Sequence, residues 1–185
     1  MKIYTKAGDQ GETGLLGGDR ISKASRRIEA IGEVDELNAS LGIVATTCNS
    51  EEFTQKIQWI QNRLFDFGSE LACPPSGKFQ LEVIHPCHVE RLESEIDTFE
   101  TELAPLKNFI LPGGCVSSSH MHLSRAICRR SERSLLRLAE EESVRPVMFE
   151  FLNRLSDWMF CASRVLNSRS GIADIIWVKD SQGQS

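Results

Sequence analysis

Residues 53–71 read FTQKIQWIQNRLFDFGSEL, and an apolar side chain returns in them every three or four positions. The repeat is carried by Phe53, Ile57, Ile60, Leu64, Phe67 and Leu71. This spacing places all of them on one face of an α-helix, whose turn takes about 3.6 residues. Because a helix with one apolar face must bury it against other elements, the stretch predicts a packed helical protein.

Four further stretches carry the same periodicity. Together they predict helices at 25–48, 51–72, 87–104, 115–142 and 146–169. Breakers rich in proline and glycine separate these helices, at 74–77, 85–86, 112–114 and 145–146. One-faced helices in this number predict an all-α protein, a five-helix bundle with a glycine-rich N-terminal loop. The segment 175–178, IIWV, could be a short strand, but Ile3-Tyr4 alone cannot complete a sheet with it.

The size and composition of the chain fit one such bundle. It has 185 residues, 41% of them hydrophobic and 25% charged, which is enough to bury a core without disulfides. We expect a single domain over 1–185, divided into an arm (1–24), the bundle (25–170) and a tail (171–185). The chain contains no apolar run of the ~20 residues that a membrane span needs. With no secretory signal at its start and six scattered cysteines, it is expected to be cytoplasmic, with reduced thiols.

The charge of the chain is unevenly distributed. The net charge is −5, which argues against nucleic-acid binding because phosphate contacts need a basic surface. Residues 1–27 nevertheless hold six bases against three acids, a net of +3, and residues 120–137 hold five arginines against one glutamate, a net of +4. Two basic patches in an acidic protein indicate a small anionic ligand.

The first basic patch contains a glycine at every third position of the stretch 5–14, TKAGDQGETG. Glycine permits a left-handed backbone and close approach, so successive backbone N–H groups can converge on an anion. Threonine hydroxyls and Lys6 offer further ligands for a phosphate. The stretch is neither a Walker A loop nor a GxGxxG turn. Taken alone, it could equally be a flexible arm without a ligand.

The second basic patch is an arginine-rich helix face. Arg125, Arg129 and Glu132 follow one another at i, i+4 and i+7, so they share a face on which arginines can hold a polyphosphate and a carboxylate can orient them. The alternative is a solvated face of salt bridges.

Other polar residues lie beside apolar faces. Asn153 lies one turn from Asp157 in the last predicted helix, and Asp35 lies beside the stripe of the first. An interhelical hydrogen bond or a buried ion pair, also between subunits, is the structural alternative to a functional role. The stretch 85–88, HPCH, lacks further ligands at metal-site spacing.

Several motifs occur together in a fixed order. They are residues 4–15, YTKAGDQGETGL, with 32–39, GEVDELNA; then 109–114, FILPGG, with 125–133, RAICRRSER; and finally 151–157, FLNRLSD. In this order and spacing they closely resemble the PduO-type ATP:cob(I)alamin adenosyltransferases, over about residues 2 to 170.

The resemblance implies a five-helix bundle that forms homotrimers, with ATP bound between neighbouring subunits. It implies transfer of the 5′-deoxyadenosyl group of ATP to the Co(I) of cob(I)alamin, which gives adenosylcobalamin and triphosphate. ATP and the corrinoid would be the small-molecule partners, and a reductase would supply electrons. Neither nucleic acid nor a membrane is expected as a partner.

The resemblance also implies roles for residues. The arm would wrap the triphosphate and its Mg²⁺ with Thr5, Lys6, Ala7, Gly8, Asp9, Gly11, Thr13 and Gly14, and no side-chain motif would bind the metal. Charge would be added by Lys23 and Arg27. The neighbouring chain would complete the nucleotide site with Arg129, Arg130, Glu132 and Arg133, and Asn153 would contact the nucleotide. Asp35 and Arg125 would pair across the interface, and Phe109 would lie below the corrin ring in an apolar pocket with Phe160.

The implied chemistry matches these residue types. Co(I) is already a strong nucleophile, so the protein must supply alignment and stabilise the triphosphate leaving group rather than provide a base. An apolar wall that excludes an axial ligand favours four-coordinate cobalt, which is easier to reduce. A non-catalytic ATP- or cobalamin-binding bundle, such as a chaperone or sensor, is the main alternative. An ATP-using transferase for another substrate is a weaker one.

Overall fold

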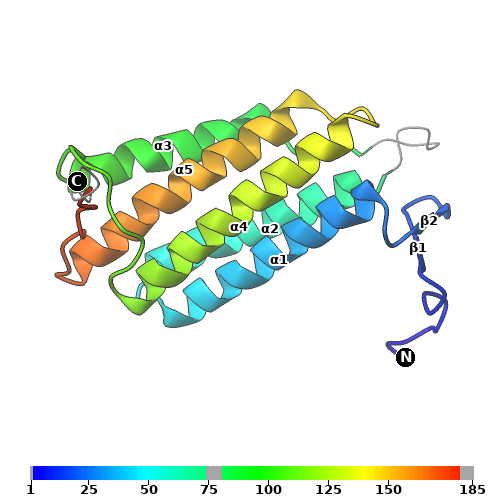
Figure 1. The fold of residues 1–185 in the computed structure, drawn as a ribbon, viewed down its shortest axis with the longest axis horizontal. Coiled ribbons are helices and arrows are strands. Elements are labelled where there is room, and N and C mark those ends of the chain that lie inside the picture. Colours follow the sequence, from blue (N-terminus) through cyan, green and yellow to red (C-terminus); the bar gives the residue numbers. More distant parts are fainter. Residues whose placement is uncertain (1, 74–80, 180–185) are drawn as a thin grey trace, which may run out of the picture.

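The computed structural model describes residues 2–73 and 81–179, which contain five α-helices. They are α1 (Arg26–Thr47), α2 (Glu51–Leu71), α3 (Pro86–Glu102), α4 (Val116–Ala139) and α5 (Pro146–Arg169). Each predicted helix is present, and most of the predicted ends lie within two residues of the observed ones. The all-α bundle is therefore confirmed (Figure 1).

The helices begin where local chemistry favours a start. Ser25, Ser50 and Cys115 each precede a helix, and each side chain accepts a hydrogen bond from a backbone N–H of the first turn. Pro86 and Pro146 occupy the first turns of α3 and α5, where a missing N–H costs nothing.

The packing order in space is α2, α1, α4, α5 and α3, with α4 in the middle. The predicted stripes form one continuous core between them. At its α3 side, the rings of Phe53 and Phe99 stack at 5.5 Å, and Phe99 lies 5.6 Å from the fully buried Trp158. Aromatic side chains thus join α2, α3 and α5.

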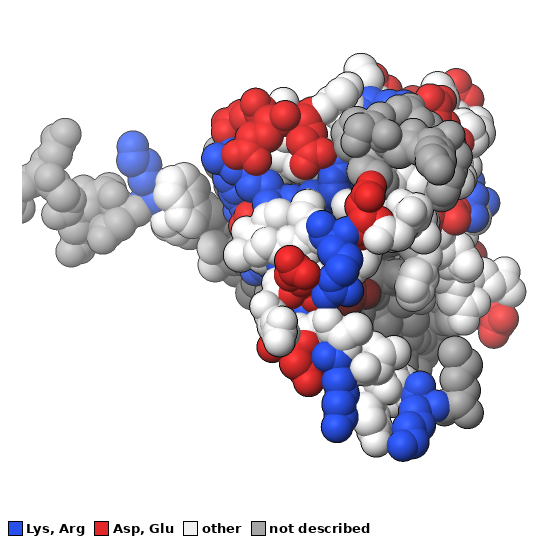
Figure 2. Space-filling view, turned by 90° about the vertical axis from the view of Figure 1, so that its right-hand side faces the viewer, with Lys and Arg blue, Asp and Glu red and all other residues white. Residues whose placement is uncertain are grey.

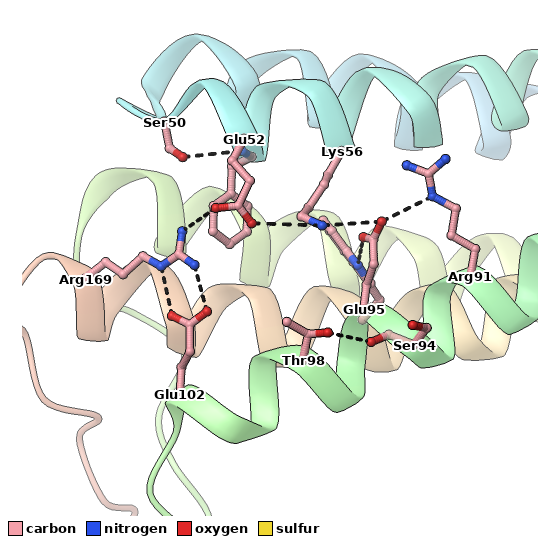
Figure 3. A network of polar contacts seen from close by, with 11 residues as sticks. Ser50, Glu52, Lys56, Arg91, Ser94, Glu95, Thr98, Glu102 and Arg169 are labelled. Carbon is pink, nitrogen blue, oxygen red and sulfur yellow. Dashed lines mark hydrogen bonds and ion pairs between the residues drawn. The ribbon is translucent and has the colours of Figure 1, made fainter.

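Ion pairs cover this aromatic junction (Figure 3). Arg169 on α5 donates to Glu102 on α3 and to Glu52 on α2, at 2.8–3.0 Å. Glu95 on α3 accepts from the indole N–H of Trp158 at 2.8 Å and lies within 3.5 Å of Lys56. Since these pairs form a network on partly buried groups, they fix α3 against its neighbours more firmly than isolated surface pairs would.

The arm contains a small hairpin that the sequence reading did not predict. Strand β1 (Glu12–Gly14) pairs antiparallel with β2 (Arg20–Ser22), with Thr13 opposite Ile21. Strands of three residues are too short to show a period-two pattern, so periodicity could not identify them. The arm projects from one end of the bundle (Figure 1), where the N–H of Leu16 donates to the carbonyl of Ala72 at 2.9 Å.

The segment after α5 has a partner other than Ile3-Tyr4. Ile176 forms a β-bridge with Ile110, and Leu111 N–H donates to the carbonyl of Ile175 at 2.8 Å. This pairing lies at the end of the bundle opposite the arm (Figure 1). None of the described helices is long and apolar enough to cross a membrane. All six cysteines fall within the described residues and are free thiols.

Candidate active site

The arm is folded around its glycines and one arginine. Gly11 adopts a left-handed backbone with φ of 83°, as an anion-binding turn requires. Gly8 lies against Lys23: a Cβ at Gly8 would be 3.0 Å from the Lys23 ammonium nitrogen. Arg20 donates to the carbonyl of Ala7 at 2.7 Å and to Glu12 at 3.1 Å. The structure thus places Lys23 beside the loop to which the resemblance assigned its charge, and it adds Arg20, which the motif reading missed.

The remaining residues of the arm present their polar groups outward. The side chains of Thr5, Lys6 and Asp9 are exposed, and Lys6 has a left-handed φ of 60°, which is rare for a residue with a Cβ. Seen from the arm end, basic side chains stand at the lower tip of the molecule and acidic ones gather at its upper edge (Figure 2). The arm therefore offers positive charge away from the acidic surface of the bundle.

Arg27 is placed differently from the other expected cations. Its side chain is buried, with the residue only 3% exposed. The guanidinium donates to the carbonyls of Leu71 and Cys73 and to the carboxylate of Glu142. Its hydrogen bonds hold the start of α1 to the end of α2 and to the α4–α5 connection. Arg27 is thus engaged in the fold, whereas the resemblance had implied a role beside the triphosphate.

The predicted arginine face lies on α4 and meets α1 and α5. Arg129 is exposed, and Arg133 donates to its carbonyl oxygen at 2.9 Å. The Nδ2 of Asn153 on α5 donates to Glu132 at 3.2 Å. The structure therefore brings the RAICRRSER and FLNRLSD motifs together, with the Asn153–Glu132 pair as their junction.

Arg130 is held by two carboxylates of α1. It donates to Glu33 at 2.6 Å and to Glu36. These hydrogen bonds raise the pKa of Arg130, so it remains charged under all conditions of interest. Glu33 and Glu36 belong to the GEVDELNA motif, but the sequence reading singled out only Asp35 there. Asp35 itself is exposed and forms no ion pair with a described residue.

A groove of about 920 Å³ runs between α3, α4 and α5, and Arg125, Arg129 and Phe160 line it. The guanidinium of Arg125 lies 6.0 Å from the centre of the Phe160 ring, which is cation–π distance. Burial and the neighbouring Arg129 lower the pKa of Arg125, although an arginine keeps its charge. The groove thus combines an aromatic wall with two arginines from one helix face.

Phe109 is presented on a firmly held loop. It is 79% exposed, and its ring meets the Trp177 ring edge-on at 6.3 Å. The N–H of Trp177 donates to the carbonyl of Phe109 at 2.8 Å. An apolar ring that is exposed on an ordered loop is a contact surface rather than core. Trp177 was not among the predicted site residues.

The loop of Phe109 is fixed by the buried Asn167, which the sequence reading also missed. Its Oδ1 accepts from the N–H of Cys115 at 3.0 Å, and its Nδ2 donates to the carbonyl of Gly113 at 3.0 Å. Gly114 has a φ of 113°, and any Cβ there would collide with Asn167. These constraints explain the second glycine of FILPGG. They connect the loop directly to α5.

The described residues contain no group of three or more His, Cys, Asp or Glu side chains that could hold a metal ion. The cations of the site are arginines and lysines, and together with the glycine loop they suit a phosphate chain.

Comparison with known proteins gives a consistent result. The model of the family described as cobalamin adenosyltransferase matches residues 3–166. The chain is 42% identical to the corrinoid adenosyltransferase of Bacillus subtilis, over 95% of this chain and 91% of that protein. It is 41% identical to the corrinoid adenosyltransferase PduO of Salmonella typhimurium, covering 95% of this chain but only 53% of that longer protein.

Solved structures agree with the sequence relatives. A variant of the PduO-type ATP:corrinoid adenosyltransferase from Lactobacillus reuteri, complexed with cobalamin and ATP, superposes with a TM-score of 0.92 at 36% identity. The match covers 95% of this chain and 96% of that one. Another variant of the enzyme from the same organism, complexed with ATP, gives 0.91 at 35% identity, covering 96% of this chain and all of that one. On its motifs, its fold and its relatives, this chain belongs to the cobalamin adenosyltransferase family.

Proposed function

We propose that this chain transfers the 5′-deoxyadenosyl group of ATP to the cobalt of cob(I)alamin. The Co(I) electron pair forms the bond to C5′, the C5′–O bond breaks, and triphosphate leaves with the electrons of that bond. The products are adenosylcobalamin and intact triphosphate. The observation that carries the proposal is Phe109, an apolar ring held outward on a loop that Asn167 and Trp177 fix. A protein that only bound ATP would have no use for it.

The arm and the arginine face would bind the nucleotide. Backbone N–H groups of residues 5–14 and the ammonium groups of Lys6 and Lys23 suit a triphosphate, whose charge Mg²⁺ would partly neutralise. Arg129 and Arg133 would stabilise the charge that grows on the leaving group, with Arg130 beside them. Glu132 and Asn153, already paired, would orient the arginines and the nucleoside.

Phe109 and Phe160 would form the apolar contact with the corrinoid. By keeping water and an axial base away from the lower face of cobalt, they would favour the four-coordinate state. A reductase would deliver the electron that produces Co(I). Once Co(I) is present, alignment with C5′ is the main requirement, and the protein needs no general base.

We also propose that the active sites form between subunits of a homotrimer. The arm and the Phe109 loop lie at opposite ends of the bundle (Figure 1), which α4 spans with 24 residues, or about 36 Å. One chain therefore does not bring both ends to one small ligand. Asp35 on one chain and Arg125 on its neighbour would then pair across the interface.

The test is an anaerobic assay with chemically reduced cob(I)alamin, ATP and Mg²⁺. We expect the corrinoid spectrum to change to that of adenosylcobalamin, with one triphosphate released per turnover. ATP binding in calorimetry without any conversion would contradict the proposal and support a non-catalytic binding protein instead.

A further inference from the structure

A buried histidine lies behind the groove. His122 on α4 is 4% exposed, and its ring meets Phe160 edge-on at 6.2 Å. Neither ring nitrogen has a hydrogen-bond partner among the described residues. Burying a polar group without a hydrogen bond costs free energy, so the burial of this imidazole requires an explanation.

Arg125 and Asp174 also have buried polar atoms without a hydrogen-bond partner among the described residues. Six buried side-chain nitrogen and oxygen atoms lack a partner within the described part of the chain, and four of them belong to His122, Arg125 and Asp174. The four are both nitrogens of His122, Nε of Arg125 and Oδ1 of Asp174. Arginine Nε–H only donates, a carboxylate oxygen only accepts, and a neutral imidazole accepts at one nitrogen and donates at the other. The donors and acceptors among the four atoms are therefore complementary, one donor for each acceptor.

The placement of these residues supports the pairing. His122 and Arg125 are three residues apart on α4, the spacing of neighbouring side chains on a helix, and both pack against Phe160. Asp174 lies in the segment after α5, and its other oxygen accepts from Nε of Arg164 on α5 at 2.7 Å. Arg164 lines the same groove as Arg125 and Phe160.

The charges around His122 favour the neutral ring. Burial lowers the pKa of His122, the nearby Arg125 lowers it further, and Asp174 opposes them. Arg164 partly neutralises Asp174 from α5. The imidazole is therefore neutral near pH 7, the only form that can accept from Arg125 while donating to Asp174.

We propose that His122 is a positioning residue that links Arg125 to Asp174 in the working enzyme. It accepts from Nε of Arg125, which leaves the outer nitrogens of that guanidinium free for the groove, and it donates to Oδ1 of Asp174. The segment of Asp174 is hydrogen-bonded to the backbone of Phe109, so the link connects the Phe109 loop to the arginine face. This role rests on the proposed function, because it serves the alignment of the two substrates.

Kinetics of three variants test the role. His122→Phe keeps a buried ring that can neither donate nor accept, whereas His122→Asn keeps one donor and one acceptor. His120→Phe is the matched control, two residues away and so on a different side of the same helix. We expect His122→Phe to lower kcat about tenfold, the effect of one lost hydrogen bond to a charged group, with the KM for ATP and the Tm little changed. His122→Asn recovers most of the loss, and His120→Phe shows none.

Two outcomes of the kinetics would overturn the role. One is an unchanged kcat in His122→Phe. The other is a loss in His122→Phe that His122→Asn does not recover, because it would show that the ring acts by shape alone.

An NMR titration of His122 tests the link without catalysis. In Asp174→Ala the pKa of His122 should fall, because a nearby carboxylate favours the protonated ring. An unchanged pKa would overturn the link to Asp174 even in an active enzyme. If the unaltered chain forms no adenosylcobalamin, the proposed function fails, and the positioning role fails with it. A fall in pKa would then show only that His122 and Asp174 interact.

Discussion

At the scale of single residues, Arg129 is a cation of α4 that is available to a ligand. It is exposed on α4, and its guanidinium has no ion-pair partner among the described residues, whereas Arg130 and Arg137 are paired with glutamates of α1. We expect Arg129→Trp to abolish turnover and to weaken ATP binding, while circular dichroism shows normal helical content. Arg137→Trp on the same helix is the control and should remain active. Unchanged steady-state kinetics in Arg129→Trp would remove this residue from the site.

Replacing Phe109 should affect the cobalt step rather than ATP binding. Because its ring is largely exposed, Phe109→Ala should change the Tm by no more than a few degrees. It should slow the cobalt step by about tenfold or more, which corresponds to ~1.4 kcal/mol of transition-state stabilisation, with little effect on ATP affinity. Single-turnover kinetics with preformed cob(I)alamin and ATP calorimetry separate the two effects. A raised KM for ATP with the cobalt step intact would show that Phe109 does not contact the corrinoid.

At the scale of elements, the helices could be predicted because each one has a long periodic stripe. The hairpin of the arm could not, because its strands have three residues each. The pairing of Ile110 with Ile176 depends on how the bundle brings distant segments together, which periodicity does not reveal. For the same reason, the motifs indicated Asn153 and Arg129 but not Asn167 or Trp177, whose roles come from contacts distant in sequence. The burial of Arg27 could not be predicted either, because the carbonyls and the carboxylate that it binds belong to segments distant in sequence.

Glu70, near the end of α2, forms an acid-sensitive group of hydrogen bonds with the segment before α3 and with Arg145; we call this group the Glu70 clamp. Glu70 is buried and accepts from the N–H groups of Val83 and Ile84 and from Arg145. Burial alone would raise the pKa of Glu70, but the hydrogen bonds from Arg145 and the two N–H groups outweigh it, so the pKa is lowered. The ionised Glu70 carboxylate therefore stabilises the fold fully at pH values above the pKa that Glu70 has in the unfolded chain. This stabilisation is lost as the pH falls through the lower pKa that Glu70 has in the folded protein.

Glu70→Gln should therefore lower the free energy of unfolding at pH 7, by about 1–3 kcal/mol for a lost charged hydrogen-bond partner. It should also flatten the acid dependence, so that the free energies of unfolding of the variant and the unaltered chain converge as the pH falls through the lowered pKa of Glu70. Urea unfolding at pH 7, 5 and 3.5 measures both effects. Glu102→Gln is the control, since Glu102 also has a lowered pKa but is far more exposed, and it should show a smaller effect. If the free energy of unfolding of Glu70→Gln changed with pH in parallel with that of the unaltered chain, the Glu70 clamp would be excluded.

At the scale of the whole molecule, the proposed trimer would build each site from two different surfaces of the chain. An apolar groove between α1 and α2 is lined by Asp35 and the exposed Phe65, and the groove of Arg125 lies on the other side, between α3, α4 and α5. Two different surfaces that complement each other produce a head-to-tail contact, which closes into a ring when the rotation allows. The arm at one end of the bundle and the loop between α3 and α4 at the other fit the same arrangement.

Mixed oligomers test this arrangement directly. Gly8→Val blocks the arm, because a Cβ there already meets Lys23 and the carbonyl of Glu12, and Arg129→Trp blocks the arginine face. Each variant alone should be inactive. When they are unfolded and refolded together in equal amounts, random assembly places an intact arm against an intact arginine face at about one quarter of the interfaces, and a similar fraction of activity should return. Arg129→Trp mixed with Arg133→Trp, which damages the same half, should recover nothing. Were the site built within a single chain, the first mixture would stay as inactive as its components.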